Sequence, residues 1–330
     1  MHIMSAFEYS FVAKELSGVL AGNHFNRMRR MDESTYRLKI GSEEVLCELG
    51  VRIHATRFIE PPAEAGKFAQ KVEKELDNAR LLSIEQINQD RILSFVFDKG
   101  SLVFEMFGKG NAILVRDGTV IAAHRYESWS DREIKAGSPY KPPKPPARSL
   151  EPSGKYIIVS LVKLPLGKEY SLEALARAGV DEKTPGASLD KKKLASIEAE
   201  VERIRKEASP IVFYKDGKPV GFSLTSLSSC ESLEVKRFPS LSEAADAYYS
   251  NVEEENPELE KLRKRLEQQK ERLAALHEEQ SAMRKQGDAI YQKYPEVESL
   301  IAMAKKGDIK ELEKRGAKID KKEKSIEMDL

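Results

Sequence analysis

DRILSFVF at residues 90–97 is an apolar, strand-like run that begins with an acid and a base side by side. It lies at the centre of the stretch from Cys47 to Asp117, between GVRIHATRF at residues 50–58 and GKGNAILV at residues 108–115. Two adjacent charges are unusual at the start of an apolar strand unless something binds them. These three segments carry the functional information in the sequence.

Short strand-like runs dominate the chain up to residue 123 and recur at intervals of roughly 8 to 12 residues. The turns DKG at residues 98–100 and RDG at residues 116–118 suit hairpins, because Asp and Gly tolerate positive φ. The pattern predicts an α+β protein built on a β-sandwich or barrel. Expected helices are 6–20 and 66–79, and expected strands are 25–31, 36–40, 44–49, 80–85, 91–97, 101–107, 112–116 and 119–123.

A proline-rich connector separates this first region, residues 1–160, from a helical one. PYKPPKPP at residues 139–146 excludes a helix or a central strand. Beyond it, a helix capped by Ser171 and stopped by Gly179 is followed by a second helix at 189–207. Residues 161–208 therefore predict a helix-hairpin-helix module, a shape that can hold a phosphate on backbone amides. A helical pair that merely packs is the alternative.

Residues 209–252 return to the composition of residues 1–160. A hairpin is expected around Asp216-Gly217, followed by a strand at 232–238 and a helix at 242–249. The helical module is therefore expected to interrupt a larger α+β body.

Residues 253–330 are highly charged and carry apolar residues in alternating steps of three and four. This heptad pattern predicts a long helix capped by Asn256, begun by Pro257 and broken at Tyr294-Pro295. Residues 297–326 supply a second arm, so an antiparallel coiled-coil hairpin is expected, with a dimeric coiled coil as the alternative. The apolar positions are Leu259, Leu262, Leu266, Leu273, Leu276, Met283 and Ile290 on the first arm, and Ile301, Ile309, Leu312 and Ile319 on the second.

Composition excludes several classes of protein. With 55 Lys+Arg against 54 Asp+Glu, the net charge is +1, so nucleic-acid binding must depend on local patches. Cys47 and Cys230 are the only cysteines, which argues against a disulfide framework or a cysteine metal cluster. The sequence has neither a signal-peptide pattern at its start nor an apolar run of roughly 18 residues. We expect a cytoplasmic protein without membrane contact, metal or cofactor.

Side chains of the three central segments form a candidate binding site. An Arg guanidinium can donate two parallel hydrogen bonds to a phosphate or a base edge, and an adjacent Asp can accept a hydrogen bond from a base amino group. Asp90 and Arg91 are therefore candidates for contact with a nucleic acid. A salt-bridged strand start is the alternative. Arg52 and His54 would share one face of a strand, although a packed histidine is common. Lys109 lies between two glycines, where an anion can approach, and a plain β-turn explains the same glycines.

These segments also carry a family resemblance. VRIHAT at 51–56, KFA at 67–69, DRI at 90–92 and GKGNAIL at 108–114 resemble, in order and spacing, the NFACT family of nuclear export mediator factors and RqcH-like proteins. The resemblance covers the whole chain, which is expected to be an N-terminal fragment or a short relative without the family's RNA-binding R domain. It implies a β-sandwich-like N-terminal domain similar to that of DNA glycosylases, a helix-hairpin-helix insert and a coiled-coil hairpin.

The resemblance also implies a function. NFACT proteins bind large ribosomal subunits blocked by peptidyl-tRNA, recruit tRNA and promote C-terminal tailing of the stalled chain. Expected partners are therefore tRNA and the rRNA and proteins of the large subunit. The family pair needed for tRNA engagement matches Asp90 and Arg91, and an acidic residue of the family's first helix, usually Asp, matches Glu8. The expected tRNA-binding residues are Asp90, Arg91, Glu8, Arg52, His54 and Lys109.

An enzyme is the competing class. The related DNA glycosylases attack through an N-terminal proline followed by glutamate and end in a four-cysteine zinc finger, whereas His2 and Ile3 stand here. The sequence has no Walker loop, HExxH pattern or paired catalytic Ser and His. We expect no catalytic residues, which leaves a general RNA- or DNA-binding protein related to glycosylases as the alternative function. A surface adhesin, suggested by the family's older fibronectin-binding name, conflicts with the missing export signal.

Overall fold

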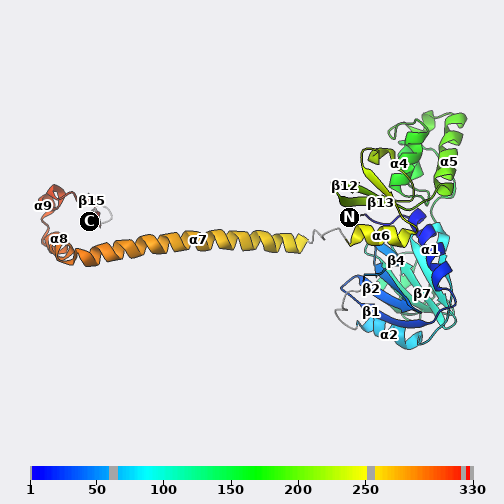
Figure 1. Cartoon of the computed structure of the whole chain (residues 1–330), viewed down its shortest axis with the longest axis horizontal. Coiled ribbons are helices and arrows are strands. Elements are labelled where there is room, and N and C mark those ends of the chain that lie inside the picture. Colours follow the sequence, from blue (N-terminus) through cyan, green and yellow to red (C-terminus); the bar gives the residue numbers. More distant parts are fainter. Residues whose placement is uncertain (1, 59–65, 251–256, 321–324, 328–330) are drawn as a thin grey trace. The chain divides into compact units, whose positions relative to one another are not determined.

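The computed structural model describes residues 2–58, 66–250, 257–320 and 325–327. The chain divides into two compact units, Met1–Glu253 and Glu254–Leu330, here called unit 1 and unit 2. Figure 1 labels their elements along the chain. The residues predicted to form a larger body interrupted by helices, up to residue 252, thus fall within unit 1.

Unit 1 is built on two antiparallel sheets, each a simple meander. The first has the strand order β1-β2-β3-β4 and the second has the order β5-β6-β7-β8-β9. The predicted strands are confirmed, with ends shifted by one or two residues at most. Their bounds are β1 Phe25–Arg30, β2 Thr35–Ile40, β3 Glu43–Glu48, β4 Arg52–Ala55, β5 Leu81–Gln86, β6 Ile92–Phe97, β7 Gly100–Glu105, β8 Asn111–Arg116 and β9 Thr119–Ala123.

The two sheets share one apolar core. The rings of Phe25 and Phe97, one from each sheet, meet edge to face with centroids 5.8 Å apart. Cys47 of the first sheet is in sulfur contact with Met106, at the end of β7, at 4.0 Å. Apolar residues on one face of each strand therefore bury against the other sheet, as the alternating sequence pattern requires.

Three helices complete this core. The helix α1 (Ala6–Leu20) packs on β4, β5 and β6, and α2 (Lys67–Glu75) packs on β1 and β9. The predicted helix at 6–20 is confirmed, and its start is fixed by a capping box between Ser5 and Glu8. The third helix, α6 (Leu241–Tyr249), packs on α1 and β4, which ties the end of unit 1 to its beginning.

The helical region contains α3 (Ile157–Leu161), α4 (Lys168–Arg177) and α5 (Lys191–Lys206). In Figure 1, α4 and α5 lie at the end of unit 1 opposite α2. The predicted cap at Ser171 is wrong, because Gly167, with φ 104°, is the N-cap and Ser171 lies inside α4. A side chain at residue 167 would collide with Ser5, so this start requires glycine. The predicted stop at Gly179 agrees with its φ of 62°.

A small three-stranded sheet follows the helical region, in the order β13-β12-β14. The predicted hairpin around Asp216-Gly217 is confirmed. Tyr170 of α4 joins this sheet to the body, because its hydroxyl accepts from the Leu224 amide at 3.0 Å. The strands are β12 Ile211–Lys215, β13 Lys218–Ser223 and β14 Glu234–Arg237.

Unit 2 begins with α7 (Pro257–Gln292), followed by α8 (Tyr294–Lys306), α9 (Ile309–Lys314) and the hairpin of β15 (Lys318–Asp320) and β16 (Ser325–Glu327). The predicted helix start and the break at Tyr294-Pro295 are confirmed. Asn256 lies outside the described residues. So do the side chains of Leu259, Leu262, Ile290 and Ile319.

The predicted second arm of a coiled coil is wrong for residues 297–326. Gly307, with φ 79°, ends α8, and a two-stranded hairpin stands where the arm was expected to continue. The α7 seam residues are correspondingly uncovered, with Leu266, Leu273 and Met283 exposed by 53%, 56% and 61%. Heptad spacing thus predicted the helix but not its packing. In the described residues, no helix is long and apolar enough to cross a membrane.

Two glycines bring the two sheets together at one end of unit 1. Gly50, in the turn between β3 and β4, lies against Gly110, in the turn between β7 and β8. A Cβ on Gly110 would overlap the Gly50 amide, and both residues have positive φ, 82° and 64°. Only glycine at both positions allows the two backbones to approach this closely.

This contact makes a testable prediction for stability. Gly110→Ala is expected to lower the free energy of unfolding of unit 1 by roughly 3 kcal/mol or more, combining the cost of positive φ with overpacking. Gly108→Ala is the matched control, because it has φ +59° in the same turn but nothing within 4 Å of its Cβ. The control should lose only about 1–2 kcal/mol. Denaturant unfolding measures both, and equal losses would contradict the close contact.

Candidate nucleic-acid interface

The turn before β6, residues 87–91, is called the β6 turn. Asn88 and Gln89 both have positive φ, 56° and 55°, which is uncommon for two successive residues other than glycine. The Gln86 side chain fixes the turn to α1, because its Nε2 donates to the carbonyls of Ala6 at 2.7 Å and Asp90 at 2.9 Å. The Asn88 side chain donates to the Pro143 carbonyl at 3.2 Å. The β6 turn is thus held on both sides.

Asp90 and Arg91 are both half-buried at the end of this turn. The Asp90 carboxylate accepts from the Arg91 amide at 2.7 Å, and the Arg91 carbonyl accepts from the Met106 amide, also at 2.7 Å. The two side chains do not form an ion pair with each other. Within the part of the chain that the structure describes, the Arg91 guanidinium has no recorded hydrogen bond or ion pair. The backbone is therefore fixed while the guanidinium stays available to a ligand.

Glu8 is completely buried, between α1, α4 and the start of the chain. Its carboxylate accepts from the Ser5 amide at 2.6 Å and the Tyr170 hydroxyl at 2.8 Å, and it lies 3.1 Å from His2 Nε2. Burial opposes the charge, but His2 and the hydrogen bonds from Ser5 and Tyr170 together outweigh burial and hold the pKa of Glu8 below its usual value. Glu8 joins three elements and has no surface open to a ligand.

Arg52 and His54 share a face of β4, as predicted, and α6 covers that face. The Arg52 guanidinium stacks 3.9 Å from the centre of the Tyr249 ring and donates to Glu48 at 2.8 Å. His54 is completely buried, 3.5 Å from Asp246, and neither ring nitrogen makes a hydrogen bond. Burial, aided by the nearby Arg52, lowers the pKa of His54 to about 3. His54 is therefore neutral and enclosed, whereas Arg52 reaches the edge of the covered face.

Lys109 is exposed at the tip of the β7–β8 turn. It lines a surface cavity of about 550 Å³, here called the aromatic pocket. The only tryptophan of the chain, Trp129, also lines this pocket, together with Arg132 and Lys144. Sequence analysis missed these three residues, because the region from 124 to 146 has no strong periodicity. The sequence signal that could have identified them was a single tryptophan near arginine and lysine residues.

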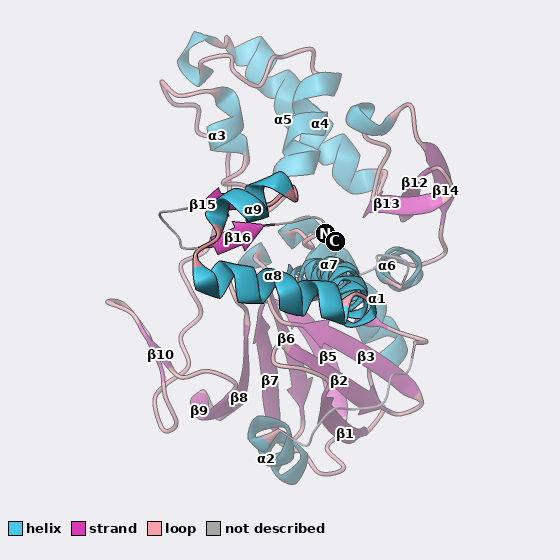
Figure 2. Ribbon diagram, turned by 90° about the vertical axis from the view of Figure 1, so that its left-hand side faces the viewer, coloured by secondary structure: helices cyan, strands magenta, loops and turns pink. Residues whose placement is uncertain are grey.

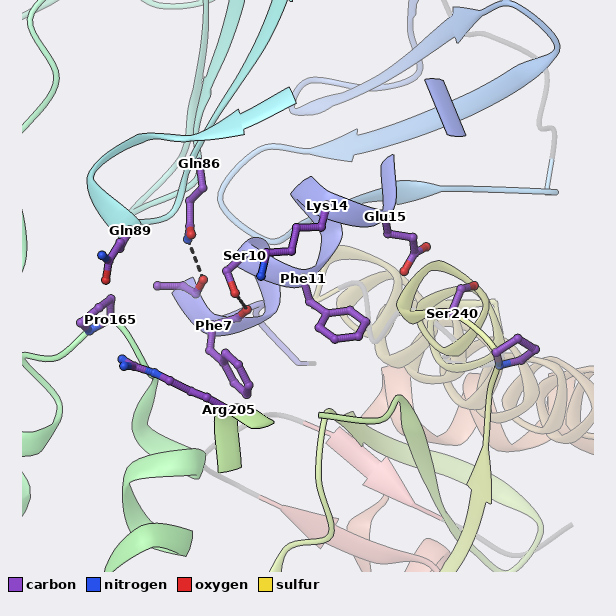
Figure 3. A pocket seen from close by; sticks show the side chains of 12 residues that line it. Phe7, Ser10, Phe11, Lys14, Glu15, Gln86, Gln89, Pro165, Arg205 and Ser240 are labelled. Carbon is purple, nitrogen blue, oxygen red and sulfur yellow. Dashed lines mark hydrogen bonds between the residues drawn. The ribbon is translucent and has the colours of Figure 1, made fainter. Parts of the chain in front are cut away.

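A second cavity lies on the other side of the β6 turn, next to α1. It has a volume of about 580 Å³ and is lined by Phe7, Phe11 and Lys14 of α1 and by Arg205 of α5. Figure 3 shows Gln89 at the rim of this cavity, facing Pro165. The β6 turn thus lines the second cavity through Gln89 and contacts Pro143 of the aromatic pocket through Asn88.

Neither cavity resembles a metal centre or an enclosed active site. Among the described residues, no group of three or more His, Cys, Asp or Glu side chains could hold a metal ion. The candidate residues either lie on surface turns or are covered side chains that hold the neighbouring elements in position. Such an arrangement suits the binding of a large ligand.

Two packed antiparallel sheets, a helical insert and a third, three-stranded sheet define an α+β protein. Residues 7–314 match the family described as NFACT N-terminal and middle domains, and the chain belongs to this family. The resemblance stated from the sequence is thereby confirmed. The helix-hairpin-helix identity of α4 and α5, and the likeness to DNA glycosylases, stay predictions.

Two curated relatives illustrate the family. The archaeal Rqc2 homolog aRqcH of Methanocaldococcus jannaschii is 31% identical over 299 residues, which cover 79% of this chain and 45% of that protein. The ribosome quality control complex subunit NEMF of Mus musculus is 26% identical over 328 residues, which cover 82% of this chain and 30% of that protein. The chain therefore spans less than half the length of either relative.

Solved structures show the same fold. The N-terminal part of the fibronectin/fibrinogen-binding protein from Streptococcus suis has a TM-score of 0.58 at 21% identity, over 75% of this chain and 99% of that chain. The fibrinogen binding protein from Staphylococcus aureus has a TM-score of 0.57 at 19% identity, over 74% and 98%. At these identities the likeness shows the fold alone.

The buried His54 predicts a pH dependence of stability. The unfolded chain takes up a proton on this side chain near pH 6.5, but the folded chain does so only near pH 3, so acidification between these values favours unfolding. His54→Leu removes no hydrogen bond. In this pH range the free energy of unfolding of the variant should fall less steeply with acidification than that of the wild type, by up to about 1.4 kcal/mol per pH unit. Denaturant unfolding at a series of pH values tests this. An unchanged profile in the variant would mean that His54 titrates normally.

Proposed function

We propose that this protein acts in ribosome quality control. It binds large ribosomal subunits that are stalled with peptidyl-tRNA, and it recruits tRNA for C-terminal tailing of the nascent chain. The names of the curated relatives, an Rqc2 homolog and subunits of the ribosome quality control complex, support this assignment over a general nucleic-acid binder related to DNA glycosylases. In this proposal the protein works in the cytoplasm, where ribosomes are.

The β6 turn is the observation that carries the proposal. It presents a carboxylate and a guanidinium side by side on a backbone fixed by Gln86, Asn88 and Met106. Arg91 can donate two parallel hydrogen bonds to a phosphate or a guanine edge, and Asp90 can accept from a base amino group. A fixed backbone reduces the entropy lost when RNA binds.

The other predicted residues have two kinds of proposed role: some can contact RNA, and the others hold helices and strands in position. Lys109 is exposed, and Arg52 reaches the surface at the edge of α6, so both can meet a phosphate. Glu8 and His54 are enclosed, and they contribute by holding α1 against α4 and β4 against α6. The proposal assigns contact with RNA to Asp90, Arg91, Arg52 and Lys109, a supporting role to Glu8 and His54, and catalysis to none of the six.

Replacing both charges of the β6 turn tests the tRNA assignment. Asp90→Ala combined with Arg91→Ala should weaken tRNA binding about tenfold to a hundredfold, because hydrogen bonds to charged groups contribute roughly 1.5–3 kcal/mol each. The full-length protein is used, and filter binding or fluorescence anisotropy at fixed salt gives the Kd.

A matched control keeps the change in charge the same. Glu234→Ala combined with Lys236→Ala removes one acid and one base from β14, whose residues are all exposed. This control should bind tRNA with the wild-type Kd. Equal affinity of the wild type and the Asp90–Arg91 double variant would refute the assignment.

Unit 2 is assigned to contact with the ribosome. Its α7 exposes leucines and a methionine in a row together with many charged residues, a surface suited to rRNA and protein partners. Deleting residues 256–330 should reduce co-sedimentation with large subunits at least several-fold while unit 1 keeps its circular dichroism spectrum. Undiminished co-sedimentation of the shortened protein would place the ribosome contact in unit 1 instead.

A further inference from the structure

The aromatic pocket contains features that the function proposed above does not use. Its central residue, Trp129, lies in the hairpin of β10 (Glu127–Ser128) and β11 (Glu133–Ile134) and is 42% exposed. In Figure 2 the β10 hairpin projects beside β8 and β9 at the edge of the five-stranded sheet. A large aromatic ring that is partly open to solvent in a cavity lacks the packing partner that such rings usually have.

Buried polar contacts fix this hairpin to the sheet. Arg132 forms two hydrogen bonds to Glu105, at 2.6 Å and 2.9 Å, and the Tyr140 hydroxyl donates to the same carboxylate at 3.1 Å. The side chains of Arg132 and Glu105 are only 7% and 2% exposed. A paired charge buried to this degree is costly unless its geometry is maintained, so the hairpin has a defined position.

The base of the hairpin is fixed separately by Asn111. Its side-chain amide donates to the Arg125 carbonyl at 2.9 Å and accepts from the Arg125 amide at 3.0 Å. The Arg125 guanidinium in turn donates to the Gly110 carbonyl. The hairpin that carries Trp129 is thereby joined to the same turn that carries Lys109.

One face of the Trp129 ring is already occupied. The Arg132 guanidinium lies 4.3 Å from the ring centroid, a cation–π arrangement. Because Glu105 holds Arg132 in place, the ring is oriented before any ligand arrives. The opposite face can accept a flat ring, and nucleobases stack on aromatic side chains in this way.

The charges around the ring suit a nucleotide. Arg132 is neutralised by Glu105, and Arg125 lies 3.8 Å from Glu127. Lys109 and Lys144, both exposed, have no recorded ion pair within the described ranges, and Asp131 is the remaining acid of the pocket. Two free ammonium groups beside an open aromatic face fit a base attached to its phosphates.

The pocket is linked to the β6 turn by one hydrogen bond. Pro143, which lines the pocket, accepts the hydrogen bond from Asn88. An RNA strand contacting Asp90 and Arg91 therefore has a second binding position along the same surface. An A-form duplex cannot place a base on Trp129, because its bases are stacked and paired.

We propose that the aromatic pocket binds an unpaired nucleotide of RNA, with its base stacked on Trp129 and its phosphates near Lys109 and Lys144. The proposal rests on the RNA-binding function proposed above and adds a single-stranded subsite to it. A proline-rich or acidic peptide is the competing occupant and serves as an outcome of the test.

Intrinsic fluorescence reports directly on this pocket, because Trp129 is the only tryptophan in the chain. The full chain is titrated with a short unstructured oligoribonucleotide, with a duplex RNA of equal length, and with inorganic polyphosphate. Saturable quenching by the single strand, and weak or absent quenching by the other two, is the expected result.

A labelled form of the same oligoribonucleotide then gives affinities by anisotropy. Trp129→Ala should raise the Kd about tenfold, the loss typical of one base–aromatic stack, and Trp129→Phe should restore most of the affinity. Tyr156→Ala, which removes another exposed aromatic ring from unit 1, is the matched control and should leave the Kd unchanged.

Several results would overturn the subsite. The first is quenching of Trp129 by duplex RNA or polyphosphate that equals the quenching by the single strand. The second is quenching by a proline-rich or acidic peptide but not by RNA. The third is a Kd for the oligoribonucleotide that is unchanged in Trp129→Ala. If tRNA binding nevertheless depends on Asp90 and Arg91, the subsite alone is refuted. If the single strand quenches Trp129 while the Asp90–Arg91 double variant binds tRNA normally, the subsite stands and the assignment of the β6 turn fails.

Discussion

The contact between Gly50 and Gly110 is the constraint on which the candidate interface depends. It joins the β3–β4 turn of one sheet to the β7–β8 turn of the other with no side chain between them. Arg52 follows the first turn, and Lys109 lies within the second. Because main-chain contacts of this kind have little freedom to shift, the candidate side chains on two separate sheets keep fixed positions at one end of the sandwich.

Buried polar groups extend this constraint outward from the sheets. Glu105, Arg132 and Tyr140 hold the β10–β11 hairpin, and Glu8, His2 and Tyr170 hold α1 against α4. Buried ion pairs add little net stability compared with well-packed apolar residues, but removing one partner is strongly destabilising. Their consequence here is a single defined geometry for surface turns that would otherwise move. Positions that look like ligand contacts in the sequence, such as Glu8, can therefore serve to support the contacts.

The sequence predicted what depends on local pattern. The short strands, the helix at residues 6–20 and the long helix from Pro257 followed from periodicity and turn chemistry. The start of α4 at Lys168 could not be predicted, because it depends on Gly167 passing close to Ser5. The position of Trp129 escaped for the same reason, and His54 could only be left open between a packed residue and a ligand contact. Both depend on contacts between segments far apart in the chain, which no local window contains.

Charge explains how a nearly neutral chain can offer a site for RNA. With a net charge of +1, the chain as a whole supplies little long-range attraction for RNA, so the proposed binding must come from local patches and short-range contacts. The candidate surface mixes Asp90 with Arg91 and places Lys109 beside an open aromatic ring. Such pairs match donors, acceptors and ring faces of bases better than they match uniform phosphate charge. In the function proposed here, a surface of this composition is expected to discriminate among RNA shapes and unpaired bases, and to gain little from duplex backbone alone.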